Sequence, residues 1–212
     1  MPKSNKESSQ VQIVALNQPI NNEGNIMKHV VFTVGRFNPP TRGHAKVCDQ
    51  VKALADKLGC DYKIFTTKSQ DSKKSPLEVT SKLEYLSKLV TGYDFQVTVN
   101  PFTACRDLAA MGYDTATLVV GADHGLGLVD QLKRYIGHPD VEHDIGLKMV
   151  EGVVIPRDTT DFSASSARAF AVEGNFEEFA KHIPHADAVI IEQLYHEVRR
   201  NLGITNDGHI QE

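Results

Sequence analysis

The chain has 212 residues, of which 41% are apolar and 24% are charged, and its net charge is −4. These values are ordinary for a folded globular protein, so they exclude a disordered chain, a collagen-like repeat and a miniprotein framed by disulfides. No basic footprint for nucleic acid is present and no apolar run approaches 18 residues, so we expect neither nucleic acid nor a membrane as a partner.

The first 27 residues differ from the rest of the chain. They begin with a polar tail, MPKSNKESSQ, that lacks the apolar core of a secretory signal, and residues 11–20 then hold a short apolar stretch that would add an edge strand. The three cysteines, Cys48, Cys60 and Cys105, form no CxxC pair, which favours a reducing compartment over a Cys-based zinc site. We therefore expect a cytoplasmic protein with an N-terminal tail at 1–27.

From residue 28 onward, short apolar runs alternate with amphipathic segments. The run HVVFTV at 29–34 is typical of a strand buried on both faces, and the segment 44–58 has apolar residues three and four apart, as in a helix. The same patterns predict strands at 62–67, 95–99, 115–120 and 148–155, and helices at 79–90, 103–111, 127–136, 165–172, 176–182 and 186–202.

Strands that alternate with helices are typical of an α/β domain built on a parallel sheet. We predict a Rossmann-like, doubly wound parallel sheet of about five strands with C-terminal helices. The domain would span 28–184, and a C-terminal helix and tail would follow at 185–212. In such folds the loops at the carboxyl ends of the strands carry the function, which directs attention to residues 35–44, 121–124 and 156–168.

The first of these loops, GRFNPPTRGH at 35–44, leads directly into a predicted helix. A helix N-terminus presents unpaired N–H groups and a partial positive charge, which together form a binding site for phosphate. Gly35 and Gly43 allow a close approach of the backbone, and His44 lies in the first turn, directed at whatever the N-terminus binds. The loop is neither a GxGxxG fingerprint nor a Walker loop.

In this strand–loop–helix setting, the segment Thr41-Arg42-Gly43-His44 resembles the (H/T)xGH signature of the nucleotidylyltransferase superfamily. The preceding GRFNPP is similar to the family's GxFxP lead-in. The resemblance implies a Rossmann-like enzyme that transfers a nucleoside monophosphate, most simply AMP from ATP, to a phosphate-bearing acceptor and releases pyrophosphate.

A second segment, FSASSAR at 162–168, resembles the ISSTxxR motif of the same superfamily. Ser163 and Arg168 match the motif and Ser165 replaces its Thr, whereas Ala164 lacks the hydroxyl of the second serine. The resemblance covers most of the region from residue 28 to about 184. The two motifs together look particularly like the small nucleotidyltransferase-like proteins of large tailed bacteriophages.

The resemblance also implies roles for the residues of these loops. His44 would stabilise the transition state at the α-phosphate, Thr41 would replace the first His of the motif as a hydroxyl donor, and Arg168 with the two serines would hold the pyrophosphate. Mg²⁺ would bridge the phosphates with no dedicated metal-binding side chain. The remaining expected nucleotide-binding residues are Gly35, Arg36, Phe37, Asn38, Gly43, Gly121 and Asp123, and the expected acceptor-binding residues are Lys73 and Lys74.

The acceptor is left open between three classes. The GRFxP lead-in is similar to nicotinamide mononucleotide adenylyltransferases, which makes that mononucleotide the first expectation. The Thr of TxGH and the segment KKSPL at 73–77 are more similar to phosphopantetheine adenylyltransferase, and the chain has no tryptophan on which nicotinamide could stack. A cytidylyltransferase acting on a small alcohol phosphate is the third class, and dimers and hexamers among relatives leave a homo-oligomer open.

Besides an unrelated doubly wound α/β protein, in which both motifs would have to be accidents, two other interpretations compete with an enzyme of this kind. One is a nucleotide-binding or virion-associated protein that retains the fold without the reaction. The other is an RNA-acting relative of class I synthetases, which the net charge of −4 and the absence of lysine in SASSAR count against. The pairs His138/His143 and His182/His185 lack a recognised ligand spacing, and we interpret all four as solvated loop residues.

Overall fold

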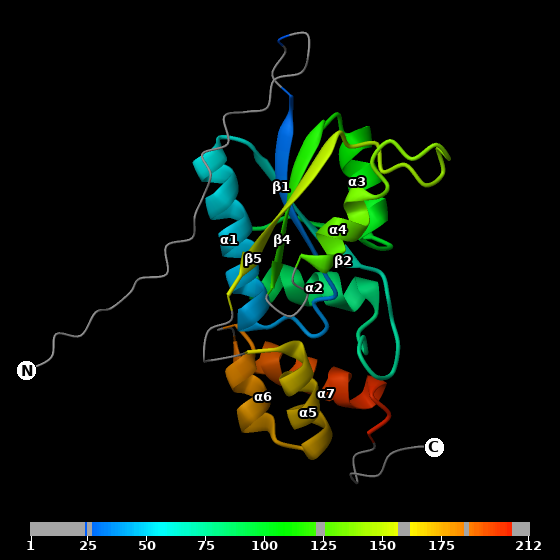
Figure 1. Cartoon of the computed structure of the whole chain (residues 1–212). Helices are drawn as coiled ribbons and strands as arrows, with labels where there is room; N and C mark the ends of the chain where they lie inside the picture. Colours follow the sequence, from blue (N-terminus) through cyan, green and yellow to red (C-terminus); the bar gives the residue numbers. More distant parts are fainter. Residues whose placement is uncertain (1–23, 25–26, 122–125, 157–161, 185–186, 205–212) are drawn as a thin grey trace, which may run out of the picture.

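The computed structural model describes residue 24 and residues 27–121, 126–156, 162–184 and 187–204. Within them, the predicted Rossmann-like α/β fold is confirmed (Figure 1). Five parallel strands form one sheet in the order β3-β2-β1-β4-β5, with β1 at its centre. The strands are β1 (His29–Gly35), β2 (Asp61–Thr67), β3 (Phe95–Thr98), β4 (Thr115–Gly121) and β5 (Met149–Ile155).

Helices cover both faces of the sheet, because β1 alternates its buried side chains between them. Val31 contributes to a core with α1 and α2, whereas Val30 and Phe32 contribute to a second core with α3 and α4. The helices described are α1 (Arg42–Leu58), α2 (Val79–Leu89), α3 (Pro101–Ala110), α4 (Gly127–Lys133), α5 (Ala164–Glu173), α6 (Phe176–His182) and α7 (Ala188–Asn201).

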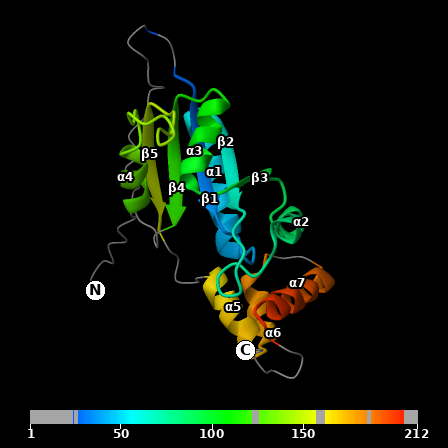
Figure 2. The ribbon, with the colours of Figure 1, turned by 90° about the vertical axis from the view of Figure 1, so that its right-hand side faces the viewer.

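The last three helices, α5, α6 and α7, pack together beyond the carboxyl ends of the strands, as Figures 1 and 2 show from two directions. Phe179 of α6 and Leu194 of α7 are buried in the same core as Val31 of β1. This helical unit therefore faces the sheet edge at which β1, β2 and β4 end, and the first of the loops predicted to carry the function, 35–44, lies between the unit and the sheet.

The observed elements differ from the predicted ones mainly at helix ends. Helix α1 begins at Arg42, two residues earlier than expected, because Thr41 caps it. Helix α4 ends at Lys133, since Arg134, Tyr135 and Ile136 donate to carbonyls three residues back. The predicted edge strand at 11–20 lies outside the described residues. No helix in the described part of the chain is long and apolar enough to span a bilayer.

Candidate active site

The residues Thr41 and His44 form a reciprocal cap at the start of α1. The Thr41 hydroxyl oxygen accepts a hydrogen bond from the His44 backbone N–H at 3.4 Å, and the Thr41 backbone N–H donates to His44 Nδ1 at 3.1 Å. Because Nδ1 is an acceptor, the neutral imidazole carries its hydrogen on Nε2. The side chain of Thr41 is buried, so its hydroxyl serves the helix cap rather than open solvent.

A buried aromatic side chain supports the imidazole of His44. The ring centroid of Phe37 lies 4.7 Å from that of His44, and Phe95 of β3 packs edge-on against Phe37 at 5.4 Å. Phe37 has a φ of 49°, which is unusual for a residue other than glycine, and only 2% of it is exposed. A Cβ at Gly35 would lie 2.7 Å from the Phe37 ring, so this glycine makes room for the ring.

Positive charge surrounds His44. Burial, together with Arg168 and Arg36, lowers the pKa of His44 to about 4. Burial and the charge of Arg36 also lower the pKa of Arg168. His44 is therefore neutral at physiological pH, and two arginines are close enough to each other to interact unfavourably. A group of cations of this kind favours binding of a polyanion.

The glycine of the TxGH segment brings the two predicted motifs together. A Cβ at Gly43 would lie 2.8 Å from the carbonyl oxygen of Phe162, so only glycine permits this approach. The neighbouring Arg42 donates to the Ile183 carbonyl at 2.9 Å, and its guanidinium lies 5.2 Å from the centre of the Phe162 ring. The start of α1 therefore contacts both the segment before α5 and the segment between α6 and α7.

The second motif caps α5 and positions its arginine. The Ser163 hydroxyl accepts from the backbone N–H of Ser166 at 3.0 Å, as an N-cap. Arg168 donates to the Asn38 carbonyl at 2.7 Å and to the Ser165 hydroxyl at 3.2 Å. These contacts direct the guanidinium toward the loop before α1, and its charge helps to lower the pKa of His44, so the structure brings His44 and Arg168 to one place.

Asn38 connects the first loop to the segment before α2. Its side-chain amide donates to the Leu77 carbonyl at 3.0 Å, and its side-chain oxygen accepts from the Leu77 N–H at 2.9 Å. Asn38 is only 1% exposed, and both polar atoms of its side chain already bond to Leu77. The predicted contact between this side chain and a nucleotide therefore stays a prediction.

The predicted acceptor lysines lie on an ordered, exposed turn. The backbone N–H groups of Lys73 and Lys74 donate to the Asp71 carboxylate at 2.8 and 2.6 Å, and they hold the pKa of Asp71 below its usual value. The Asp71 N–H donates to the Ser75 carbonyl at 2.9 Å, which closes the turn. Both lysine side chains are exposed at the same sheet edge as His44. Their ammonium groups are therefore available to an anion.

The third predicted loop is described only at its start. Gly121 ends β4 at the same sheet edge, and among the described residues no atom beyond its chain neighbours lies within 4 Å of the place where a Cβ would be. Asp123, predicted near the ribose and base, lies outside the described residues. Among the described residues, no group of three or more His, Cys, Asp or Glu side chains is arranged to hold a metal ion.

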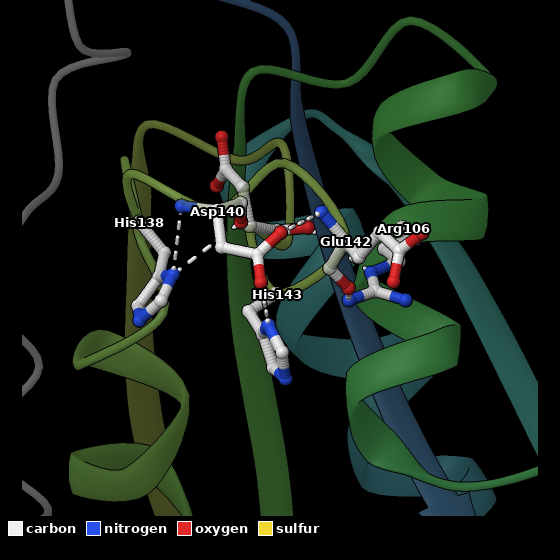
Figure 3. A network of polar contacts seen from close by, with 6 residues as sticks. Arg106, His138, Asp140, Glu142 and His143 are labelled. Carbon is white, nitrogen blue, oxygen red and sulfur yellow. Dashed lines mark hydrogen bonds and ion pairs between the residues drawn. The ribbon is translucent and has the colours of Figure 1, made fainter.

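His138 and His143 lie away from this site, and His182 is buried. His138 and His143 lie in the loop before β5, at the amino ends of the strands, where His143 Nδ1 is 2.7 Å from the Asp140 carboxylate (Figure 3). Arg106 of α3 donates to backbone carbonyls of the same loop. The expectation that His182 is solvated is wrong. It is buried between the rings of Phe162 and Phe170, and its counterpart His185 lies outside the described residues.

Three side chains at this edge were not singled out from the sequence. Arg42 occupies the variable position x of the TxGH motif, and Asp71 is one of several polar residues in the loop after β2, so neither gave a signal in the sequence. Lys82 gave the clearest signal, because it lies on the apolar stripe of its helix, four residues before Leu86, where a charge is unusual.

A family model described as cytidylyltransferase-like matches residues 32–170, a range that contains His44, Lys73, Lys74 and Arg168. No match to the chain exists among curated proteins.

Solved structures resemble the fold at low identity. A protein of Vibrio parahaemolyticus described as a nicotinate-nucleotide adenylyltransferase is 13% identical, with a TM-score of 0.48 over 80% of this chain and 96% of that one. Thermotoga maritima TmcAL, bound with α-thio ATP, is 12% identical, with a TM-score of 0.49 over 82% of this chain and 56% of that one. A macrolide-efflux protein of Streptococcus pneumoniae is 17% identical, with a TM-score of 0.45 over 73% and 56%.

Proposed function

The chain belongs to the cytidylyltransferase-like family, and on this premise we propose that it transfers a nucleoside monophosphate to a phosphate-bearing acceptor and releases pyrophosphate. The observation that supports the proposal most directly is the group formed by neutral His44, Arg36 and Arg168 at the start of α1. It combines a fixed hydrogen-bond donor with two cations, which suits a triphosphate.

His44 acts in this proposal as a neutral donor and not as an acid or base. Its Nε2–H would donate to an oxygen of the α-phosphate and bind more strongly as charge develops there during in-line attack. The acceptor phosphate needs no general base, because its second pKa near 6 leaves it mostly dianionic at neutral pH. The reaction then depends on positioning and on charge stabilisation.

Arg168 would stabilise the pyrophosphate as it leaves. Its contacts with Asn38 and Ser165 hold the guanidinium in place before any ligand binds, so little conformational entropy is lost on binding. Ser163 already caps α5, and Ser165 accepts from Arg168, so both hydroxyls contribute mainly by orienting this helix and its arginine.

Mg²⁺ would enter with the triphosphate and neutralise part of its charge. Apart from the Asp71 carboxylate, the groups named above around His44 are cations and neutral donors, so phosphate oxygens and water would supply most ligands of the ion. The chain's own contribution is the placement of His44, Arg36 and Arg168 around the phosphates.

We propose ATP as the nucleotide and nicotinamide mononucleotide as the first acceptor to test, because of the GRFNPP lead-in before the TxGH segment. Phosphopantetheine is the second, because Thr41 and the lysine turn at 73–77 are similar to that class. A small alcohol phosphate with CTP is the third, and the family to which the chain belongs supports its inclusion.

The test is pyrophosphate release with Mg²⁺, each of the four nucleoside triphosphates and four acceptors. The acceptors are nicotinamide mononucleotide, nicotinate mononucleotide, phosphopantetheine and glycerol 3-phosphate. Release that depends on one acceptor and is lost in His44→Ala would establish the reaction and its substrates. Triphosphate binding without release for every pair would instead indicate a nucleotide-binding protein.

A further inference from the structure

The first turn of α2 contains a lysine with no solvent exposure. Lys82 is among the largest fully buried side chains, and its Nζ donates a hydrogen bond to the carbonyl of Thr67. Burial lowers its pKa to about 8, and no neighbouring charge among the described residues contributes to that change. A buried ammonium without a carboxylate partner loses hydration energy that a single carbonyl restores only in part.

The position is also unfavourable for a cation in two further respects. Lys82 lies near the N-terminus of its helix, where the helix dipole is positive. It also lies on the apolar stripe with Leu86, where a methionine or leucine would pack without the cost of burying charge. Stability alone therefore does not account for this residue, and its contact with Thr67 is the feature to explain.

Thr67 is the last residue of β2, and residues 68–70 connect it to the turn, closed by Asp71 and Ser75, that carries Lys73 and Lys74. The Thr67 hydroxyl is 2.8 Å from that of Ser69, which is in turn 3.5 Å from that of Ser75. Lys82 therefore anchors the end of β2, from which the chain leads into the turn.

The end of the turn is anchored separately. There, Asn38 makes two hydrogen bonds to the backbone of Leu77. Both anchors are buried, and between them they set where the two lysines lie relative to His44.

We propose that Lys82 is a positioning residue for the acceptor half of the site, a role that rests on the proposed nucleotidyl transfer. Its hydrogen bond to Thr67 holds the lysine turn in place, and its charge, in surroundings of low dielectric constant, adds to the attraction for the acceptor's phosphate. It does not touch the substrate. Its effect passes through the backbone at Thr67 and through the electrostatic potential.

The first experiment needs no substrate. Amide hydrogen exchange is compared between the wild type, Lys82→Met and Lys88→Met, the last a control on the exposed face of the same helix. The amides of Lys73, Lys74 and Leu77 report directly, because each donates a hydrogen bond within or at the end of the turn. We expect Lys82→Met to accelerate their exchange about tenfold, the equivalent of one lost hydrogen bond, and the control to leave it unchanged.

The second experiment measures turnover and thermal unfolding of the same proteins, with Lys82→Arg added. We expect Lys82→Met to unfold at the same or a higher temperature, to raise the acceptor KM about tenfold, and to leave the triphosphate KM within about twofold. Lys82→Arg, which keeps a cation and a donor, should fall between the wild type and Lys82→Met.

The outcomes separate this proposal from the proposed reaction. A lower unfolding temperature with an unchanged acceptor KM would make Lys82 a purely structural residue and overturn the proposal. Unchanged exchange in the turn would overturn it as well, whether or not the wild type has activity. Exchange that is faster in Lys82→Met than in the wild type, together with no acceptor-dependent pyrophosphate release by the wild type, would instead support the anchoring role of Lys82 and reject the proposed reaction.

Discussion

The backbone N–H of Thr41 donates to Nδ1 of His44. This one hydrogen bond is part of the cap of α1, and it also places the single N–H of the neutral imidazole on Nε2. A capping box normally uses Glu or Gln at the position that His44 occupies. The helix start and the proposed donor therefore depend on the same pair of residues. Replacing either residue should change the stability of α1 and the orientation of the imidazole together.

His44→Ala should lower the turnover number by roughly two orders of magnitude or more, the usual cost of losing one transition-state donor. Part of the cap is lost as well, so a loss of about 1 kcal/mol in the free energy of unfolding should accompany it. Pyrophosphate release under saturating substrates measures the first effect, and denaturant titration measures the second. Thr41→Ser, which retains the capping hydroxyl, is the control and should remain close to wild type in both.

The pH dependence of stability should show the low pKa of His44. Its folded pKa of about 4 lies below the value of 6.5 that it has when unfolded, so between these values the unfolded chain binds more protons. The contribution of His44 to stability is therefore fully present above pH 6.5 and is lost as the pH falls toward 4. Unfolding measured across this window should show a weaker acid destabilisation in His44→Ala than in the wild type.

The pH dependence of activity should have a different origin. Since His44 is neutral throughout the range above pH 5, the acidic limb of the rate should follow the acceptor phosphate, with an apparent pKa near 6. An acceptor analogue whose phosphate has a lower second pKa should move this limb downward by the same amount. If the acidic limb does not move with the acceptor, the limb reports a group of the protein, and this result would contradict a neutral His44.

Local sequence patterns were sufficient to predict the order of strands and helices, because each strand is a short apolar run and each helix has a clear apolar stripe. The site was predictable where it consists of one continuous segment, as in TxGH. The cap formed by His44 was missed, because the usual pattern expects Glu or Gln at that position.

Contacts between segments distant in the chain could not be predicted from local patterns. The closeness of Gly43 to Phe162 and the pairing of Asn38 with Leu77 depend on how the loops meet at the sheet edge. His182 looked like a solvated residue because its aromatic neighbours, Phe162 and Phe170, are not adjacent to it in sequence. Lys82 was visible as a charge on an apolar stripe, but its partner Thr67 was not.

Gly43→Ala should impair the site through the backbone. The added Cβ would lie 2.8 Å from the Phe162 carbonyl, so the segment that begins α5 must move away from α1. We expect a loss of about 1–3 kcal/mol in the free energy of unfolding and a roughly tenfold rise in the triphosphate KM. Gly127→Ala is the matched control, because no atom of the described residues outside its own helix and chain neighbours lies within 4 Å of its added Cβ. Equal behaviour of the two variants would contradict the close approach.

Arg168→Ala should weaken triphosphate binding about tenfold to a hundredfold, because it removes a partly buried cation that we propose contacts the phosphates. Isothermal titration with a non-hydrolysable triphosphate measures the change. Arg134→Ala, at the opposite edge of the sheet, removes the same charge and should have little effect. If the two variants bind alike, Arg168 serves only to connect α5 to Asn38.

Asn38→Ala tests whether the two halves of the site are held in one arrangement. The variant leaves the buried N–H and carbonyl of Leu77 without their partner, which should cost about 2–3 kcal/mol of stability. It should also raise the KM for the acceptor, because the Asn38 side chain holds the end of the lysine turn. The KM for the triphosphate should rise as well, because the backbone carbonyl of Asn38, which accepts from Arg168 and is retained in the variant, loses the side-chain contacts that fix its position. Asn100→Ala, which removes the N-cap of the distant α3, provides a variant of lowered stability for comparison. A rise in both KM values in Asn38→Ala and in neither for Asn100→Ala would show that position, and not stability alone, is what Asn38 supplies.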